Sequence, residues 1–155
     1  MDKAEVKTRR LKSAQASERF GRAIGRELRG GEVIELISDL GGGKTTLAKG
    51  IAKGAGSADH VTSPSFTIRN DYSANGIAIA HFDFYRLSDV GTLREMLAEV
   101  LTDPETAVLI EWAAIIDDVL PADHVKIRLI STSDGGRKLA AEYPRHFSYL
   151  FKKAF

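Results

Sequence analysis

The sequence of 155 residues contains no cysteine. Disulfides, thiol catalysis and cysteine-based metal sites are therefore excluded. The sequence also lacks a long apolar run, since no stretch approaches the roughly 18 residues that a membrane span requires. Residues 1–15 carry charges with no apolar segment behind them, so they do not resemble a secretory signal. These absences predict a cytoplasmic protein with no membrane partner.

Neither sign of charge is in excess. The chain has 22 Lys and Arg against 21 Asp and Glu, which gives a net charge of +1. This balance does not predict nucleic acid as a direct ligand, and contact with tRNA or DNA would need a local basic patch or a partner protein. The hydrophobic content of 43% and charged content of 28% are ordinary for a globular protein. The length fits one domain over 1–155.

The spacing of apolar residues indicates a mixed α/β domain. Helical spacing predicts helices over residues 13–29, 45–54 and 92–101. Short apolar runs predict buried strands at 33–37 and 107–110. Alternating patterns predict two antiparallel hairpins, with strands at 65–72 and 77–85 and at 124–130 and 137–143. The aromatic and basic tail, 145–155, is either a terminal helix docked on the core or a segment that binds a partner.

Residues 38–46, SDLGGGKTT, lie between a predicted strand and a predicted helix. They nearly match the phosphate-loop pattern G-x-x-x-x-G-K-[ST], in which Ser38 stands at the position of the first glycine. If that position needs a positive φ, serine costs about 1–2 kcal/mol there, and otherwise it costs little. A purely structural strand–helix connection gives no reason for Lys44, Thr45 and Thr46 at the helix start, so we predict a nucleotide site.

The predicted loop explains how phosphates would be bound. Backbone N–H groups of a glycine-rich loop can surround anionic oxygens at a helix N-terminus. Lys44 would reach the β- and γ-phosphates, and the Thr45 hydroxyl would bind Mg²⁺. The residues that can form the cradle are Leu40, Gly41, Gly42 and Gly43.

A phosphate loop also needs an acid at the end of a nearby strand. Glu111 is the stronger candidate, because it directly follows the apolar run at 107–110. Asp83 is the second candidate, and it either joins Glu111 at the metal or merely caps a strand end. On spacing alone, Trp112 is interpreted as a packing residue and His81 as a hydrogen-bonded structural residue.

Several motifs occur in an order that resembles one family. SDLGGGKTT (38–46) is followed by VTSPSFTIRNDY (61–72), HFDFYRL (81–87) and LIEW (109–112). Together they are similar to the TsaE family, also called YjeE, of small bacterial ATPases needed for threonylcarbamoyladenosine modification of tRNA. The resemblance extends from the N-terminal helix to the turn at 136–137. SPSFT and HFDFYRL are more specific than the phosphate loop, which many unrelated NTPases share.

The resemblance implies a three-layer P-loop fold with ATP or ADP and Mg²⁺ in the site. It implies that Thr45 and Glu111 bind the metal and that Lys44 binds the phosphates. Asp83 would assist hydrolysis or hold a metal-bound water. The family binds the TsaD–TsaB pair and uses ATP binding or hydrolysis to reset that complex between turnovers. Such a protein would meet tRNA only indirectly, through these partners.

The same resemblance implies roles for further residues. Trp112 would pack or act as a gate beside the site, and Ser13 and Arg137 fall where the family contacts the adenosine end. A switch that senses the γ-phosphate would be formed by Ser63, Pro64, Ser65, Phe66 and Thr67.

Four residues depart from the family pattern. Ser38 replaces a glycine, and Ser65 stands where threonine is usual. Leu97 occupies a position that is usually glycine, and Ala113 one that is usually proline. The four residues with the central roles, Lys44, Thr45, Asp83 and Glu111, are retained. We therefore expect nucleotide binding to be kept and the hydrolysis rate or partner coupling to be altered.

Two other functions remain open at this point. One is a nucleotide-gated interaction module that does not hydrolyse ATP. The other is a small-molecule kinase, which usually needs an arginine-bearing lid and a second substrate pocket. The arginines near loops, Arg69, Arg86, Arg94 and Arg137, are dispersed along the chain, so the kinase ranks last.

Overall fold

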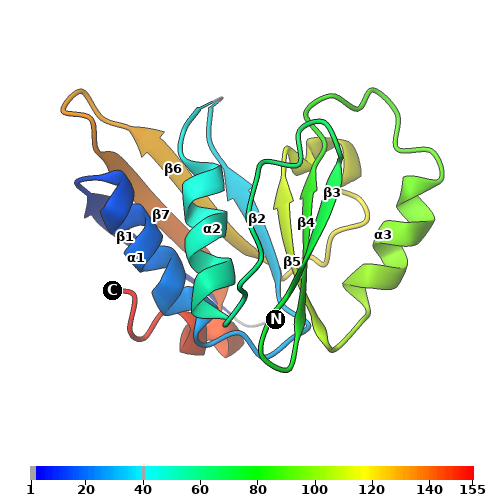
Figure 1. The fold of residues 1–155 in the computed structure, drawn as a ribbon, viewed down its shortest axis with the longest axis horizontal. Helices are drawn as coiled ribbons and strands as arrows, with labels where there is room; N and C mark the ends of the chain where they lie inside the picture. Colours follow the sequence, from blue (N-terminus) through cyan, green and yellow to red (C-terminus); the bar gives the residue numbers. More distant parts are fainter. Residues whose placement is uncertain (1–2, 40) are drawn as a thin grey trace.

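The computed structural model describes residues 3–39 and 41–155 and builds them around one mixed sheet (Figure 1). Within these residues the strand order is β1-β7-β6-β2-β5-β4-β3. The strands are β1 (Ala4–Leu11), β2 (Val33–Ile37), β3 (Arg69–Ser73), β4 (Ala78–Asp83), β5 (Thr106–Glu111), β6 (Val125–Ser131) and β7 (Arg137–Pro144). Strands β6, β2, β5 and β4 are parallel, whereas β7 and β3 run antiparallel to β6 and β4. The predicted parallel core with antiparallel hairpins is confirmed.

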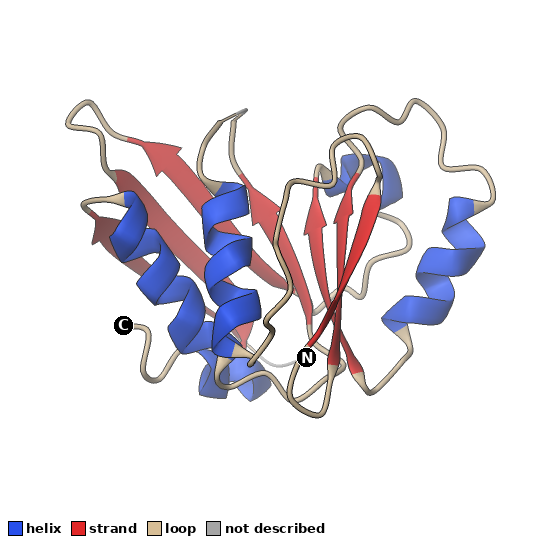
Figure 2. Ribbon diagram, viewed as in Figure 1, coloured by secondary structure: helices blue, strands red, loops and turns tan. Residues whose placement is uncertain are grey.

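Helices cover both faces of this sheet. They are α1 (Ala14–Gly25), α2 (Lys44–Gly54) and α3 (Leu93–Leu101), with short 3-10 helices η1 (Ala113–Ile116) and η2 (Arg145–Leu150). None of the helices in the described part of the chain is long and apolar enough to cross a bilayer. Helices α1 and α2 lie side by side over one face (Figure 2). Along β5, Leu109 packs into the core under α1 and α2, and Ile110 packs into the core under α3. The architecture is therefore the predicted three-layer α/β arrangement.

Helices α1 and α2 approach each other so closely that glycine is needed at their contact. A Cβ atom on Gly25 would overlap the backbone carbonyl oxygen of Ile51. A Cβ atom on Gly54 would likewise overlap the carbonyl oxygen of Arg22. This close contact fixes α2, and with it the glycine-rich loop, against the core.

Helix α1 begins where it is predicted and ends earlier. The Ser13 hydroxyl accepts a hydrogen bond from the Ala16 N–H at 3.1 Å, which satisfies one of the free donors of the first turn. The helix ends at Gly25 instead of near Arg29, because the following turn tightens, with the Leu28 N–H donating to the Gly25 carbonyl at 3.2 Å. Leu28 still packs against the core, which explains its place in the helical pattern.

Strand β1 has no counterpart among the predicted elements. Its side chains are mostly exposed, and Leu11 is its one buried residue, so the sequence lacks the alternation that indicates a strand. Backbone pairing holds it instead, in an antiparallel register with β7 that runs from Ala4 opposite Pro144 to Leu11 opposite Arg137.

The tail docks on the core, as the first of the two interpretations of this segment predicts. Leu150, Phe151 and Ala154 are buried in the cluster under α1 and α2. The ring of Phe155 meets that of Phe20 edge-on, with centroids 5.2 Å apart. These contacts bring the C-terminus beside β1 and α1 (Figure 1).

Candidate functional site

The glycine-rich loop follows β2 at the edge of the sheet where the parallel strands end. It leads directly into α2 (Figure 1). Leu36 of β2 lies opposite Glu111 of β5, and Glu111 lies opposite Asp83 of β4. Three parallel strands therefore place both predicted acids beside the loop. In open α/β sheets, ligands bind at this carboxyl edge.

A pocket of about 320 Å³ lies between the loop and the strand ends. Its lining includes ten of the predicted site residues: Gly41, Gly42, Gly43, Lys44, Thr45, Ser63, Ser65, Asp83, Glu111 and Trp112. Tyr85 and Arg86 complete the lining. Leu40, which was also predicted for the phosphate cradle, lies outside the described residues.

Ser38 takes the position of the first loop glycine without the strain of a positive φ. Within the described chain, the non-glycine residues with positive φ are Ile68 and Trp112, so Ser38 does not carry that cost. Its side chain has a steric consequence instead. A Cβ atom on Gly42 would lie 2.6 Å from the Ser38 Cβ and would overlap its Oγ. Ser38 therefore makes glycine necessary at position 42.

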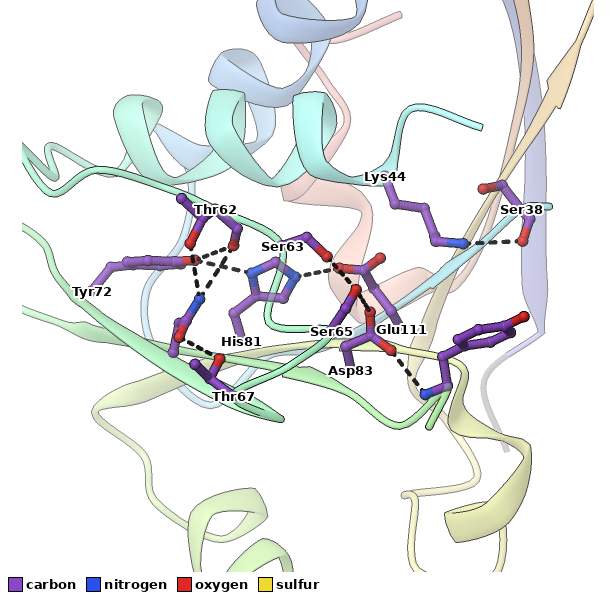
Figure 3. Close-up of polar contacts among 12 residues, drawn as sticks. Ser38, Lys44, Thr62, Ser63, Ser65, Thr67, Tyr72, His81, Asp83 and Glu111 are labelled. Carbon is purple, nitrogen blue, oxygen red and sulfur yellow. Dashed lines mark hydrogen bonds and ion pairs between the residues drawn. The ribbon is translucent and has the colours of Figure 1, made fainter. Parts of the chain in front are cut away.

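Lys44 begins α2, and its ammonium group lies inside the pocket. Nζ donates a hydrogen bond to the Ser38 carbonyl at 3.1 Å (Figure 3). It also lies 4.2 Å from the centroid of the Trp112 ring. Burial lowers the pKa of Lys44, against the opposing effect of the nearby carboxylates, of which Glu111 and Asp83 contribute most. A phosphate in the pocket could replace the contacts of Nζ with the Ser38 carbonyl and the Trp112 ring.

Glu111 is held by a chain of buried hydrogen bonds (Figure 3). His81 Nε2 lies 2.6 Å from Glu111 Oε2, and both side chains are buried. The Tyr72 hydroxyl lies 3.1 Å from His81 Nδ1, and it is also 3.3 Å from the Thr62 carbonyl. Burial raises the pKa of Tyr72, which keeps the phenol protonated. Among the described residues, the Glu111 side chain uses only Oε2 in hydrogen bonds, so Oε1 remains for a ligand.

Asp83 is bonded to the segment that follows Thr62. The Ser65 hydroxyl donates to Asp83 Oδ2 at 3.0 Å, and the Ser63 and Ser65 hydroxyls lie 2.7 Å apart (Figure 3). The other carboxylate oxygen, Oδ1, accepts from the Tyr85 N–H at 2.8 Å. Of the predicted switch residues, Ser65 is thus hydrogen-bonded to a carboxylate that lines the pocket, and Ser63 is connected to that carboxylate through Ser65.

The oxygen donors of the pocket suit Mg²⁺ better than a metal that needs a full protein cage. In the part of the chain that the structure describes, no group of three or more His, Asp or Glu side chains is placed to hold a metal. The pocket does present two carboxylates, Asp83 and Glu111, and the Thr45 hydroxyl. Mg²⁺ is usually bound by one or two carboxylates together with phosphates and water.

The predicted switch segment is split between the pocket and the surface. Ser63 and Ser65 line the pocket, whereas Pro64, Phe66 and Thr67 do not. Phe66 is 82% exposed, so its ring faces solvent. Only the two serines are therefore placed to meet a phosphate in this conformation.

A strained residue ends this segment. Ile68 has φ 69°, a conformation that is a genuine outlier for a β-branched side chain. Its N–H donates to the Pro64 carbonyl at 2.7 Å, and its carbonyl accepts from the Asp83 N–H at 2.9 Å. The strand β3 begins at the next residue, Arg69, later than the predicted start at 65. Such strain costs about 1–3 kcal/mol and is often found at switch regions.

Trp112 lies beside the phosphate loop in a left-handed conformation, with φ 57° and ψ 53°. Its ring contacts the Lys44 ammonium and the Tyr85 ring, the latter at a centroid distance of 4.8 Å. Ala113 follows it, and a proline there would restrict Trp112 to extended conformations. Leu97, the other departure from the family pattern, is fully buried in the core under α3 and does not line the pocket.

A second, smaller pocket of about 110 Å³ adjoins the loop at the start of α1. Ser13, Thr46 and Arg137 line it together with Gly43, which also lines the larger pocket. Arg137 Nε donates to the Gly42 carbonyl at 2.9 Å. The structure therefore brings the two residues predicted for the adenosine end to one place next to the phosphate loop.

Sequence patterns alone did not assign roles to Tyr85 or Arg86, and they predicted His81 only as a hydrogen-bonded structural residue, without its partner Glu111. The alternation along β4 already places His81 and Asp83 on one face, and this was the available signal for contact with Glu111. Tyr85 and Arg86 lie in the HFDFYRL motif, which could have indicated their place in the pocket.

Comparison with known proteins identifies the family of this chain. Residues 11–139 match the family model described as threonylcarbamoyl adenosine biosynthesis protein TsaE. The chain belongs to the TsaE family. A TsaE protein from Treponema pallidum is 34% identical over 128 residues, which cover 83% of this chain and 94% of that protein. One from Bacillus subtilis is 34% identical over 109 residues, which cover 70% and 68%.

Solved structures show the same fold. The crystal structure of Bacillus subtilis YdiB matches with a TM-score of 0.80 over 99% of this chain and 97% of that chain, at 23% identity. This likeness agrees with the P-loop NTPase fold expected from the phosphate loop. As a TsaE protein, the chain has a role in tRNA threonylcarbamoyladenosine biosynthesis and in nucleotide binding.

Proposed function

We propose that this TsaE protein binds ATP with Mg²⁺ and hydrolyses it slowly, as an accessory protein that acts on the TsaD–TsaB complex. One observation carries the proposal. Lys44, Thr45, Asp83 and Glu111 come from three separate segments and line the same pocket at the carboxyl edge of the parallel strands. A cation, a hydroxyl and two carboxylates in this arrangement match the parts that a P-loop NTPase uses.

Each group has a defined task in the proposed site. The loop N–H groups and Lys44 would bind the phosphates, and Thr45 and Glu111 would hold Mg²⁺ with help from Asp83. When bound, Mg²⁺ neutralises charge that develops on the phosphates. His81 keeps one Glu111 oxygen in a buried hydrogen bond, so the other oxygen keeps a fixed direction. Ser13 and Arg137 would bind the adenosine end in the smaller pocket.

The switch would respond to the γ-phosphate through Ser63 and Ser65. In this structure their hydroxyls are bonded to each other and to Asp83. A γ-phosphate or its metal in the pocket would compete for the same groups and rearrange the segment. Phe66 and Tyr85, which are 82% and 51% exposed near the pocket, would carry this change to the partner surface.

Nucleotide binding is tested by titrating the protein with ATP and ADP in the presence of Mg²⁺. Trp112 is the single tryptophan, and it contacts Lys44, so its fluorescence reports on the pocket. We expect a saturable change that Lys44→Ala abolishes. Lys49→Ala removes a cation from the same helix outside the pocket and should bind as the wild type does. No saturation, with or without TsaD and TsaB, would contradict the proposal.

Hydrolysis is tested separately by phosphate release. We expect turnover that rises when TsaD and TsaB are added and that Glu111→Ala abolishes. Nucleotide binding without phosphate release, with and without the partners, would contradict hydrolysis and favour the alternative of a nucleotide-gated interaction module.

A further inference from the structure

A groove separate from the phosphate-loop pocket is basic. It measures about 570 Å³ and lies between the C-terminal end of β1, one face of α1 and the tail. Figure 1 shows these three segments side by side. Seven of its lining residues are basic and none is acidic. The basic residues are Arg9, Arg10, Lys12, Arg19, Arg22, Arg26 and Lys153.

The cations in this groove are only partly neutralised. Arg10, Arg22 and Lys153 form ion pairs with acids outside the lining. Arg9 donates to a backbone carbonyl, which leaves its charge uncompensated. In the described part of the chain, the side chains of Lys12, Arg19 and Arg26 have no hydrogen-bond or ion-pair partner, and all three are exposed.

The overall composition does not reveal this concentration of positive charge. The whole chain has 22 basic and 21 acidic residues. Seven basic residues without an acid in one groove leave the rest of the chain net acidic. The molecule is therefore polarised, and its field favours an anion at the groove over an anion elsewhere on the surface.

The shape of the groove indicates whether an extended or a small anion fits it. Arg19 and Arg22 of α1 and Arg26 at its C-cap recur at helical spacing, over about 10.5 Å. Lys12 and Lys153 add cations from two other segments. An open row of exposed cations from several segments suits an extended chain of phosphates better than one small anion.

Of the parts of a nucleic-acid strand, the groove can contact the phosphate backbone but not the bases. Its floor contains the side chain of Phe20, which is only 4% exposed and so cannot stack on a base. Arginine guanidinium groups bind phosphate oxygens in pairs of hydrogen bonds, and such contacts carry no sequence information. Binding at this groove would therefore be strong at low salt and independent of sequence.

We infer that this groove binds the phosphate backbone of RNA directly. The family role in tRNA modification supplies the polyanion, and the inference rests on that role and not on ATP hydrolysis. The expectation of indirect contact with tRNA rested on the family's protein partners and on the near-neutral net charge, and net charge does not reveal a local patch. Ser13 lines both the groove and the small pocket beside Gly43, so RNA bound here would lie next to the proposed nucleotide.

The test measures binding of the full chain to a fluorescently labelled tRNA transcript by anisotropy over a range of salt concentrations. The variant Lys12→Gln/Arg19→Gln/Arg26→Gln removes the three unpartnered cations. We expect an affinity loss of at least tenfold and a decrease of about 2 to 3 in the slope of log affinity against log salt concentration. Poly-uridine should respond in the same way, because the contacts do not read sequence.

A matched control removes three cations that do not line the groove, in Lys3→Gln/Lys49→Gln/Arg128→Gln. It should retain most of the wild-type affinity. An equal loss in the control would overturn the inference, as would no binding of tRNA by the wild type at low salt. Binding of poly-glutamate without binding of tRNA would also overturn it and would identify an acidic protein surface as the occupant. The double variant Arg19→Gln/Arg26→Gln provides a milder change if the triple variant is poorly folded.

Discussion

The imidazole Nε2 of His81 lies 2.6 Å from Oε2 of Glu111, and both side chains are buried on neighbouring strands. This contact holds the carboxylate through a ring that is itself held by Tyr72. The chain of hydrogen bonds continues to the Thr62 carbonyl, just before the proposed switch segment. The proposed metal ligand and the switch are therefore physically connected inside the protein.

Replacing His81 should weaken Mg²⁺ binding in the nucleotide complex. His81→Phe keeps a buried ring but leaves Glu111 without its hydrogen bond. Loss of such a supporting contact typically costs 10–100-fold in metal affinity. We expect the Mg²⁺ concentration needed for the Trp112 response to ATP to rise by about that factor. Tyr72→Phe removes only the hydrogen bond between Tyr72 and His81 and should raise the Mg²⁺ midpoint less. An unchanged Mg²⁺ midpoint in His81→Phe would refute the role of His81 in positioning Glu111.

Ser38 and Gly42 should behave as a coupled pair. Gly42→Ala should destabilise the loop by about 1–3 kcal/mol, because the new Cβ meets the Ser38 side chain. Ser38→Gly alone should change ATP affinity little, since Ser38 has no positive φ. The double variant should regain most of the loss, which a cycle of thermal unfolding and ATP titrations measures. Additive effects of the two substitutions would show that their contact does not matter.

The sequence predicts the elements that are buried on both faces better than those held by backbone pairing. β5 reads as a continuous apolar run, and β2 as an apolar run interrupted only by Glu35, because helices cover both sides of these strands. β1 has no such signal, since it is exposed and depends on pairing with β7. The end of α1 also depends on a local turn that the helical spacing of Leu28 conceals.

The residues of the candidate site also differ in how far the sequence predicts them. The motif predicts Lys44 and Thr45, and the acid after a buried strand predicts Glu111. The contact of His81 with Glu111 depends on the register of β4 against β5, which no local pattern contains. The basic groove is harder still, because no local pattern shows that the end of β1, one face of α1 and Lys153 come together, and the net charge averages these cations with all other residues.

Ile68 should show the signature of backbone strain. A glycine tolerates φ 69°, whereas an alanine retains the cost of a positive φ, and both remove the isoleucine side chain. Ile68→Gly should therefore be more stable than Ile68→Ala by about 1 kcal/mol, the reverse of the usual order outside such positions. Chemical denaturation of the two variants measures this difference. A more stable alanine variant would show that Ile68 is not strained in solution.

His124 should make stability depend on pH. Burial lowers the pKa of His124, but the hydrogen bonds to Glu35 and to the Pro121 carbonyl outweigh it, so the folded pKa is raised. The resulting stabilisation is complete below the ordinary histidine value of about 6.5 and is lost as the pH rises through the folded pKa. His124→Gln should therefore be less stable than the wild type at pH 5 to 6, by up to about 2 kcal/mol, with a smaller difference at pH 9.

The comparison needs a second histidine, because other groups also titrate over this range. His60 is exposed, so His60→Gln provides the control for the loss of an imidazole at the surface. Unfolding free energies at several pH values, taken as differences from the wild type, isolate the effect of each ring. A difference for His124→Gln that stays constant from pH 5 to pH 9 would show that protonation adds nothing to the contact with Glu35, because the neutral ring makes the 2.8 Å hydrogen bond equally well.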